Sequence, residues 1–271
     1  FTAVKETLQT FAKDPNWHLH GKLGFIAVLH TWSQKLIDHF HIHCLIPAGV
    51  LSFTKDSWIP ANESFLFRVE SLAKEFKKRY LDYLTTAYRK GELIFPGDTV
   101  KFESPQGFAQ LLESLLETTW IAYAKCPFAG PEQVLEYLGR YTHRVAITNN
   151  RIISIDNGTV TFTYRDRQDN NKIKPMDLTA DEFIRRFLLH VLPRGFMKIR
   201  YFGFLAHINK KQAVALIRNL LEVTTNLEKT KETIPEMMLR LTGTDITCCP
   251  RCKKGTMTII RKLSRHYYDS S

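Results

Sequence analysis

Long apolar runs and a disulfide framework are missing from this sequence of 271 residues. No stretch approaches the roughly 18 uninterrupted apolar residues that a membrane-spanning helix needs. The N-terminus has no basic segment followed by an apolar one, so a secretory signal is not indicated. Cysteine is scarce: there are five, and three crowd near the C-terminus, a pattern that suits a metal site better than disulfides. We therefore expect a globular, cytoplasmic protein in a reducing compartment.

Acidic residues are outnumbered, with 27 Asp and Glu against 38 Lys and Arg, for a net charge of +11. Residues 1–136 carry 14 basic against 15 acidic side chains, whereas residues 137–211 carry 14 against 6 and residues 212–271 carry 10 against 6. A basic excess concentrated behind position 136 suits contact with a polyanion such as nucleic acid. A merely solubilising basic surface would give the same composition, and charge alone does not separate the two.

Apolar periodicity changes several times along the chain, and it predicts an α+β fold. Strands and helices interleave without regular βα alternation, which favours an antiparallel sheet with flanking helices. The first two strands are expected to pair, and an Asn157-Gly158 step marks a later hairpin turn. We expect residues 1–240 to form one domain, followed by a short basic, cysteine-containing tail, 241–271. The expected strands are 24–30, 40–50, 120–125, 144–155, 159–165 and 196–205, and the expected helices are 3–11, 61–90, 107–116, 131–143, 181–191 and 210–225.

Histidines alternate along the second expected strand, at His39, His41 and His43. Because successive strand residues face opposite sides, these three imidazoles share one face and invite a divalent metal. If the preceding strand pairs through a tight turn, His30 and Gln34 fall on that same face, and Gln34 could supply an oxygen ligand. The alternative is that these histidines are hydrogen-bonded core residues, and their alternation favours metal binding instead.

Two tyrosines, Tyr137 and Tyr141, stand four residues apart on an expected helix. This spacing places them on one helical face, so both hydroxyls can serve a single site. The alternative is an aromatic stripe that packs into the core, and by itself that is the commoner outcome. Arg140 and Arg144 surround the pair with positive charge, which suits a phosphate and is awkward for a core.

A metal face and a tyrosine pair together indicate phosphoryl transfer. A phenol is a weak nucleophile near neutral pH because its pKa is about 10, and a phosphodiester resists attack because of its own negative charge. A divalent ion draws charge off the phosphorus and orients the phosphate. A covalent tyrosyl phosphate conserves the bond energy for rejoining, so strands can be moved without ATP.

The sequence resembles the two-tyrosine rolling-circle transposases of bacterial insertion sequences, which belong to the wider HUH nuclease superfamily. A histidine-hydrophobe-histidine motif followed by a helix with a Tyr-x-x-x-Tyr pair carries the resemblance, which covers roughly residues 20–255. The blocks that match, in the family's order, are LHTWSQ at 29–34, HIHCL at 41–45, YLGRYTHRVAI at 137–147 and HVLPRGFMKIRYFG at 190–203.

The resemblance implies a transposase that cleaves and rejoins single-stranded DNA, at transposon ends and targets, through a 5′-phosphotyrosine intermediate. It implies an HUH-nuclease-like fold, with residues 1–240 as the catalytic domain. Tyr137 and Tyr141 would be the nucleophiles. His41 and His43 would hold Mg²⁺ or Mn²⁺, and Gln34 sits where related replication initiators place an acid ligand.

Further residues are expected to hold DNA, and one family feature is missing. We expect Arg140, Arg144, Arg194 and Lys198 to contact the DNA. The family carries a cysteine-rich zinc module near its N-terminus, whereas this chain begins after it, inside an expected helix. That start suggests a fragment of a longer protein and puts recognition of DNA ends in doubt.

Near the C-terminus, Cys249 and Cys252 resemble one knuckle of a zinc ribbon. Only half of such a site is visible, with Cys248 and His266 as the other local candidates, so zinc binding there stays open.

Three other functions are compatible with parts of this pattern. A plasmid relaxase or replication initiator shares the metal and tyrosine chemistry, and the extended family blocks favour the transposase over it. A non-catalytic nucleic-acid-binding protein would use the histidines for structural zinc. A metal-dependent hydrolase would use water and form no covalent adduct with DNA.

Overall fold

The computed structural model describes residues 1–17, 19–62, 66–125, 127–128, 130–142, 146–223 and 233–258. The chain divides into two compact units, Phe1–Val223 and Thr224–Ser271. The predicted boundary at residue 240, between a catalytic domain and a short tail, stays a prediction. No helix in the described ranges is both long and apolar enough to cross a membrane.

The central sheet of the first unit has three antiparallel strands in the order β3-β2-β9. They are β2 (Phe25–Trp32), β3 (Asp38–Leu45) and β9 (Ile199–Phe202). The predicted antiparallel pairing of the first two strands is confirmed, with Ile26 opposite Leu45 and His30 opposite His41. A β-bulge between His30 and Trp32 then shifts the register. Such a bulge re-aims the side chains that follow it.

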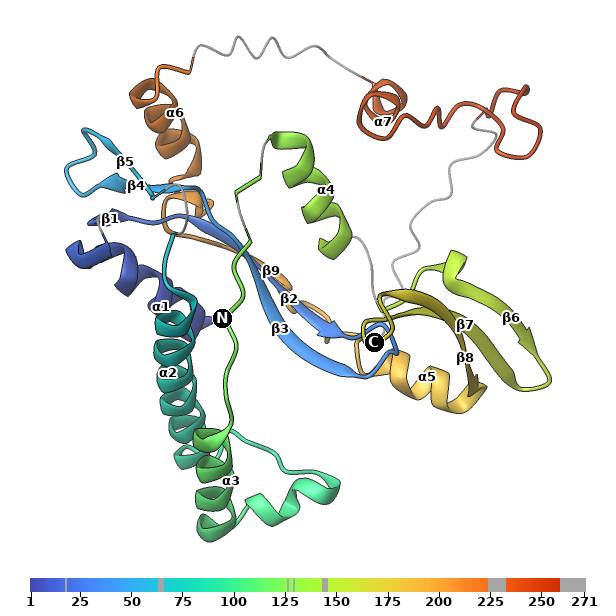
Figure 1. Ribbon diagram of the computed structural model, residues 1–271, viewed down its shortest axis with the longest axis horizontal. Coiled ribbons are helices and arrows are strands. Elements are labelled where there is room, and N and C mark those ends of the chain that lie inside the picture. The colour runs from blue at the N-terminus through green and yellow to red at the C-terminus, as the bar shows by residue number, and fades with distance from the viewer. Residues whose placement is uncertain are drawn as a thin grey trace, which may run out of the picture. The chain divides into compact units, whose positions relative to one another are not determined.

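The helices α1 (Thr2–Lys13) and α2 (Val69–Arg89) lie on one side of this sheet, and α4 (Pro131–Thr142) lies on the other (Figure 1). Phe25 and Ala27 of β2 are fully buried in the main core, where they join Leu8 and Phe11 of α1. Burying a side chain as large as that of Phe25 contributes about 1.5–3 kcal/mol. The alternate residues of β2, among them His30, therefore point to the other face of the sheet, where α4 lies.

A second small sheet forms from β1 (Gly21–Lys22), β4 (Gly49–Ser52) and β5 (Trp58–Pro60), in the order β1-β4-β5. The prediction of one continuous strand over 40–50 is wrong, because β3 ends at Leu45 and β4 belongs to this other sheet. Pro47 explains the break, since it has no amide hydrogen to donate to a ladder.

A third sheet contains β6 (Ile152–Asp156), β7 (Thr159–Asp166) and β8 (Lys172–Thr179) in that order. The predicted hairpin turn is confirmed at Asn157 and Gly158, both at positive φ as a type I′ turn requires. The strand expected over 144–155 begins only at Ile152, because residues 149–151 form the 3₁₀ turn η3 (Asn149–Arg151). Residues 144–145 lie outside the described residues. The helix α5 (Ala180–Leu188) packs Phe183 and Phe187 against the buried Phe162.

The expected single sheet is thus three sheets, and one expected strand does not form. Trp120–Lys125 forms no strand and pairs with none in the described part of the chain, so that prediction is wrong. Its Ile121 and Tyr123 are 88% and 82% exposed. A strand forms only where a partner satisfies its backbone, and sequence pattern alone does not supply that partner. The other elements of the first unit are η1 (Pro15–Trp17), η2 (Gly97–Phe102), α3 (Pro105–Glu117), η4 (Gly203–Leu205) and α6 (Lys210–Leu220).

The strand expected over 196–205 is shorter than predicted because Gly203 turns the chain. Its φ is +60°, and a Cβ there would lie 1.6 Å from the carbonyl oxygen of Leu23. Only glycine combines that conformation with so close an approach. Phe204 follows at once and is buried.

The second unit contains one described helix, α7 (Ile234–Thr242). A capping box starts it, with the Thr233 hydroxyl accepting from the Glu236 amide while the Glu236 carboxylate accepts from the Thr233 amide. Gly243, in the left-handed conformation, ends it. Cys248 then pairs with Thr256 in an isolated β-bridge.

Candidate metal centre and tyrosine helix

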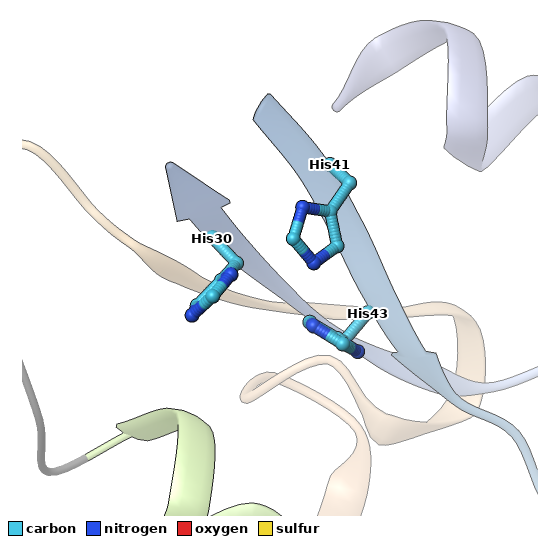
Figure 2. A group of neighbouring side chains, drawn as sticks. All are labelled: His30, His41 and His43. Carbon is cyan, nitrogen blue, oxygen red and sulfur yellow. The ribbon is translucent and has the colours of Figure 1, made fainter. Parts of the chain in front are cut away.

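Three histidines meet on the face of the central sheet that α4 covers. His30 comes from β2, and His41 and His43 come from β3 (Figure 2). Their ligand nitrogens all lie within 4.8 Å of one another. The strand register produces this cluster, because it sets His30 directly opposite His41, two residues from His43 on the same face.

The environment of the cluster keeps the imidazoles neutral. Burial lowers the pKa of His30 to about 3, helped by the neighbouring His41, His43 and Lys198. Burial lowers the pKa of His43 to about 4, with His41 and Lys125 adding to the shift. Burial also lowers the pKa of His41. Neutral imidazole is the form that binds metals, so the three rings are ready as ligands at neutral pH.

The donor set fits a divalent ion. Imidazole nitrogen is a common ligand of transition metals, and three such nitrogens leave further positions of an ion open to water or substrate. Mg²⁺ prefers oxygen ligands and would need water or substrate oxygens to complete its octahedral shell here. The identity of the ion, predicted as Mg²⁺ or Mn²⁺, remains a prediction.

Gln34 lies in the turn that follows the β2 bulge, outside this group. Its side-chain oxygen is 3.5 Å from the backbone amide of Arg165, which donates to it, and its carbonyl accepts from the Arg151 guanidinium at 2.6 Å. Gln34 as a metal ligand therefore stays a prediction, while His30 is the residue that joins His41 and His43. The sequence analysis placed His30 on this face but did not name it as a ligand. The pairing of His30 with His41 across the two strands is the signal that would have identified it.

Tyr137 reaches the histidines from α4, the helix that the sequence predicted. Its phenol oxygen lies 2.8 Å from Nδ1 of His43. The Phe128 ring packs beside the tyrosine, with ring centroids 5.3 Å apart. The side chains of Tyr141 and Arg140 lie outside the described residues, as does the whole of Arg144. The structure thus brings one of the two predicted nucleophiles to the predicted metal face.

Positive side chains surround the cluster. Lys198, a predicted DNA-binding residue, lies with its ammonium 4.7 Å from the centre of the Trp32 ring, and that ring is 4.0 Å from the His30 ring. The charges of Lys125 and Arg167 act on His43 and His41 respectively. Arg194, also predicted to bind DNA, is exposed in the loop before β9. Cations around a metal face favour an anionic substrate.

A buried histidine supports the turn between β2 and β3. His190 is 2% exposed, its Nε2 lies 3.1 Å from the carbonyl oxygen of Leu36, and its Nδ1 lies 3.3 Å from the Thr31 hydroxyl. Leu36 is fully buried at a positive φ of 58°, a conformation that a leucine adopts only when its surroundings hold it there. The His190 contacts therefore help to fix the hairpin that carries the three metal-facing histidines.

The C-terminal cysteines belong to the second unit. The Gly255 amide donates to Cys252 Sγ at 3.3 Å, and backbone hydrogen bonds from Lys254 and Gly255 lower the pKa of the Cys252 thiol. Amides that point at a sulfur in this way stabilise a thiolate. Among the described residues, no third ligand joins Cys249 and Cys252 within metal-binding distance. The zinc knuckle therefore stays a prediction.

Comparisons with known proteins agree on one family. A family model described as "Putative transposase" (Y2_Tnp) matches residues 24–213. "Putative transposase y4qJ" of Sinorhizobium fredii is 43% identical over 263 residues, covering 96% of this chain and 66% of that protein. "Transposase for insertion sequence element IS801" of Pseudomonas savastanoi pv. phaseolicola is 26% identical over 187 residues, covering 69% of this chain and 44% of that protein. The chain thus spans just under two thirds of the first relative and less than half of the second. No solved structure matches.

Proposed function

The chain belongs to the Y2_Tnp transposase family, and from this premise we propose that it cuts and rejoins single-stranded DNA through a covalent bond between Tyr137 and a 5′-phosphate. The matched range, 24–213, contains the three histidines of the cluster and all of α4. A histidine face on an antiparallel sheet, opposite a tyrosine helix, is the arrangement expected of an HUH-nuclease-like catalytic domain.

The contact between Tyr137 and His43 carries this proposal. A neutral imidazole has one protonated nitrogen, and the nitrogen that binds an ion carries no proton. If Nε2 of His43 binds the ion, Nδ1 carries the proton, and its N–H donates to the phenol oxygen and stabilises the phenolate that must form. The phenol proton then passes to solvent. This arrangement lowers the free-energy cost of a phenolate nucleophile at neutral pH.

The histidine cluster completes the chemistry. An ion held by His30, His41 and His43 would supply Lewis-acid activation of the scissile phosphate. The Tyr137 oxygen forms a bond to phosphorus, the bond from phosphorus to the 3′-oxygen breaks, and that oxygen leaves and takes up a proton. Rejoining is the reverse step, in which a 3′-hydroxyl attacks the tyrosyl phosphate and frees the phenol.

The two tyrosines then have different roles. Tyr137, which contacts His43, makes the first cut, and Tyr141, one helical turn further along α4, takes a second strand. Two nucleophiles on one face allow one covalent link to form while another is resolved. Lys198, Lys125 and Arg167 hold the phosphates that flank the cut.

The proposal is tested with end-labelled single-stranded oligonucleotides and Mn²⁺. We expect a protein–DNA adduct that survives denaturation, forms on the 5′-phosphate side of the cut and requires the added ion. Duplex DNA of the same sequence serves as the control substrate and should give little adduct. Metal-dependent cleavage without any adduct would identify water as the nucleophile and overturn the proposal in favour of a hydrolase.

A further inference from the structure

A second feature of the first unit is an open groove of about 520 Å³, away from the histidine cluster. The end of α1, the strands β1 and β4, η4 and one face of α6 line it. It lies by the start of β2, whereas His30 stands near the end of that strand. Seven residues at about 3.3 Å each separate Leu23, at the groove, from His30, so roughly 20 Å lies between the two places.

The charge of the groove has one sign. Lys13, Lys22 and Lys55 line it and are all exposed. None of the lining residues, every one of which the structure describes, is Asp or Glu. The side-chain amides of Asn209 and Gln212 add hydrogen-bond donors on the α6 side. Three ammonium groups and two amides, without a carboxylate among them, complement an anion that carries several charges along its length.

The groove also offers an aromatic surface. Phe53 is 39% exposed although it is a large apolar side chain, and the His20 ring packs edge-on against it at 5.1 Å. The His20 ring is held in turn by the Lys13 carbonyl, 2.9 Å from Nδ1. An exposed aromatic ring beside lysines is the combination by which proteins bind single-stranded nucleic acid, because bases stack on the ring while ammonium groups meet the phosphates. A free inorganic anion would use only the lysines.

We propose that this groove is a second DNA-binding site, which holds the sugar-phosphate backbone of the strand at a distance from the point of cleavage. The inference rests on the proposed function for the identity of the polyanion. At 3.4 Å per nucleotide in a stacked strand, roughly 20 Å corresponds to about six nucleotides. The groove therefore contacts only strands that extend at least about that far beyond the cut.

The test compares two triple variants by fluorescence anisotropy in EDTA, where no cleavage occurs. One is Lys13→Glu/Lys22→Glu/Lys55→Glu, and the control is Lys74→Glu/Lys78→Glu/Lys101→Glu, three exposed lysines outside the groove with the same change in net charge. For an oligonucleotide of about 20 nucleotides, we expect the groove variant to bind at least about tenfold more weakly. Its salt slope should fall by about 2, since each lost phosphate contact removes about 0.7. The control variant should lose less than about threefold, and an oligonucleotide of about five nucleotides should bind both variants like the wild type.

Two more measurements keep the outcome decisive. Phe53→Ala should weaken binding of the long strand while leaving its salt slope unchanged, because stacking releases no counterions. Adduct formation on the short oligonucleotide should stay at the wild-type rate in the groove variant, which shows that the fold and the cluster are intact. Equal losses in the two triple variants, or none in either, would overturn the second site. The second site would also be overturned if the groove variant lost affinity for inorganic phosphate but not for DNA, because that result would indicate a small-anion site. Absence of any adduct in the wild type would instead count against the proposed function.

Discussion

Tyr137 and His43 stand 94 residues apart in the chain, and yet the phenol oxygen of one lies 2.8 Å from a ring nitrogen of the other. The tyrosine therefore sits against one of the three imidazoles of the histidine cluster. Because this contact joins the proposed nucleophile to a proposed metal ligand, the role of each of these side chains can be tested by a separate substitution.

Removing the Tyr137 hydroxyl should abolish the first covalent step. Tyr137→Phe keeps the ring and its packing against Phe128 but removes the oxygen that contacts His43. We expect adduct formation to fall at least about 10³-fold with DNA affinity unchanged. Tyr141→Phe should still form the first adduct and fail in strand transfer. The reverse assignment, in which Tyr141→Phe loses the first adduct and Tyr137→Phe retains it, would show that the proposed order is wrong.

His30 should contribute as much to metal affinity as His41 and His43 do. His30→Ala removes one of three clustered ligand nitrogens, so we expect the Mn²⁺ concentration needed for half-maximal nicking to rise at least about 100-fold. Gln34→Ala should raise it by less than about tenfold, because its oxygen already accepts from the Arg165 amide. Titration of nicking against Mn²⁺ measures both. Equal losses in the two variants would make Gln34 a ligand as well.

Lys198 should contribute to DNA affinity through one phosphate. Lys198→Ala should reduce the salt slope of single-stranded DNA binding by about 0.7 and weaken binding uniformly across sequences. Arg194→Ala should give a similar reduction, since Arg194 is exposed in the loop before β9. Lys74→Ala, an exposed lysine on α2 outside the groove, is the control. Salt slopes that match the wild type in both variants would place the DNA elsewhere.

The buried His190 should be needed for stability. His190→Ala leaves a cavity and takes the hydrogen-bond partner from the Leu36 carbonyl and the Thr31 hydroxyl. We expect the free energy of unfolding to fall by about 2–4 kcal/mol. The matched control is His207→Ala, because His207 is exposed and should cost less than about 1 kcal/mol. Urea denaturation gives both values, and similar losses at the two positions would contradict a supporting role.

Replacing either of two glycines with similar φ angles by alanine should lower the stability by very different amounts. Gly203→Ala puts a Cβ 1.6 Å from the Leu23 carbonyl oxygen, and we expect at least about 3 kcal/mol of destabilisation, or failure to fold. Gly158→Ala, at φ +73° with nothing within 4 Å, should cost only about 1–2 kcal/mol. Thermal melting compares the pair. A mild Gly203→Ala would show that η4 can move away from β2.

Much of the site followed from local pattern. The alternation of His41 and His43 and the four-residue spacing on α4 are periodicities that strands and helices impose on any sequence. The Asn157-Gly158 turn was predictable for the same reason, because few residues adopt its backbone angles. In each case, the information lies within a few residues of chain.

What sequence reasoning missed depends on partners that are distant in the chain. Strict alternation predicts Gln34 on the face of His30, but it cannot foresee the β-bulge between His30 and Trp32 or the contact of the Gln34 side-chain oxygen with the Arg165 amide, and the ligand role of Gln34 stays a prediction. The strand β8 was not expected, because it contains the charged residues Lys172, Lys174 and Asp177. Its pairing with β7 supports it. Trp120–Lys125 shows the opposite case, a β-rich segment that finds no partner within the described residues.

The hairpin of β2 and β3 brings His30, His41 and His43 together within a stretch of 14 residues, 30–43, so its closure requires only a short loop. The Tyr137 contact closes a loop of 94 residues. Each doubling of loop length adds only about 0.6 kcal/mol of closure entropy, so the long loop costs about 2 kcal/mol more than the short one. The metal face can therefore form early in folding, before the tyrosine arrives. Insertions or deletions in the intervening helices α2 and α3 should shift that closure cost by only a few tenths of a kcal/mol, which leaves the length of this region free to vary between relatives.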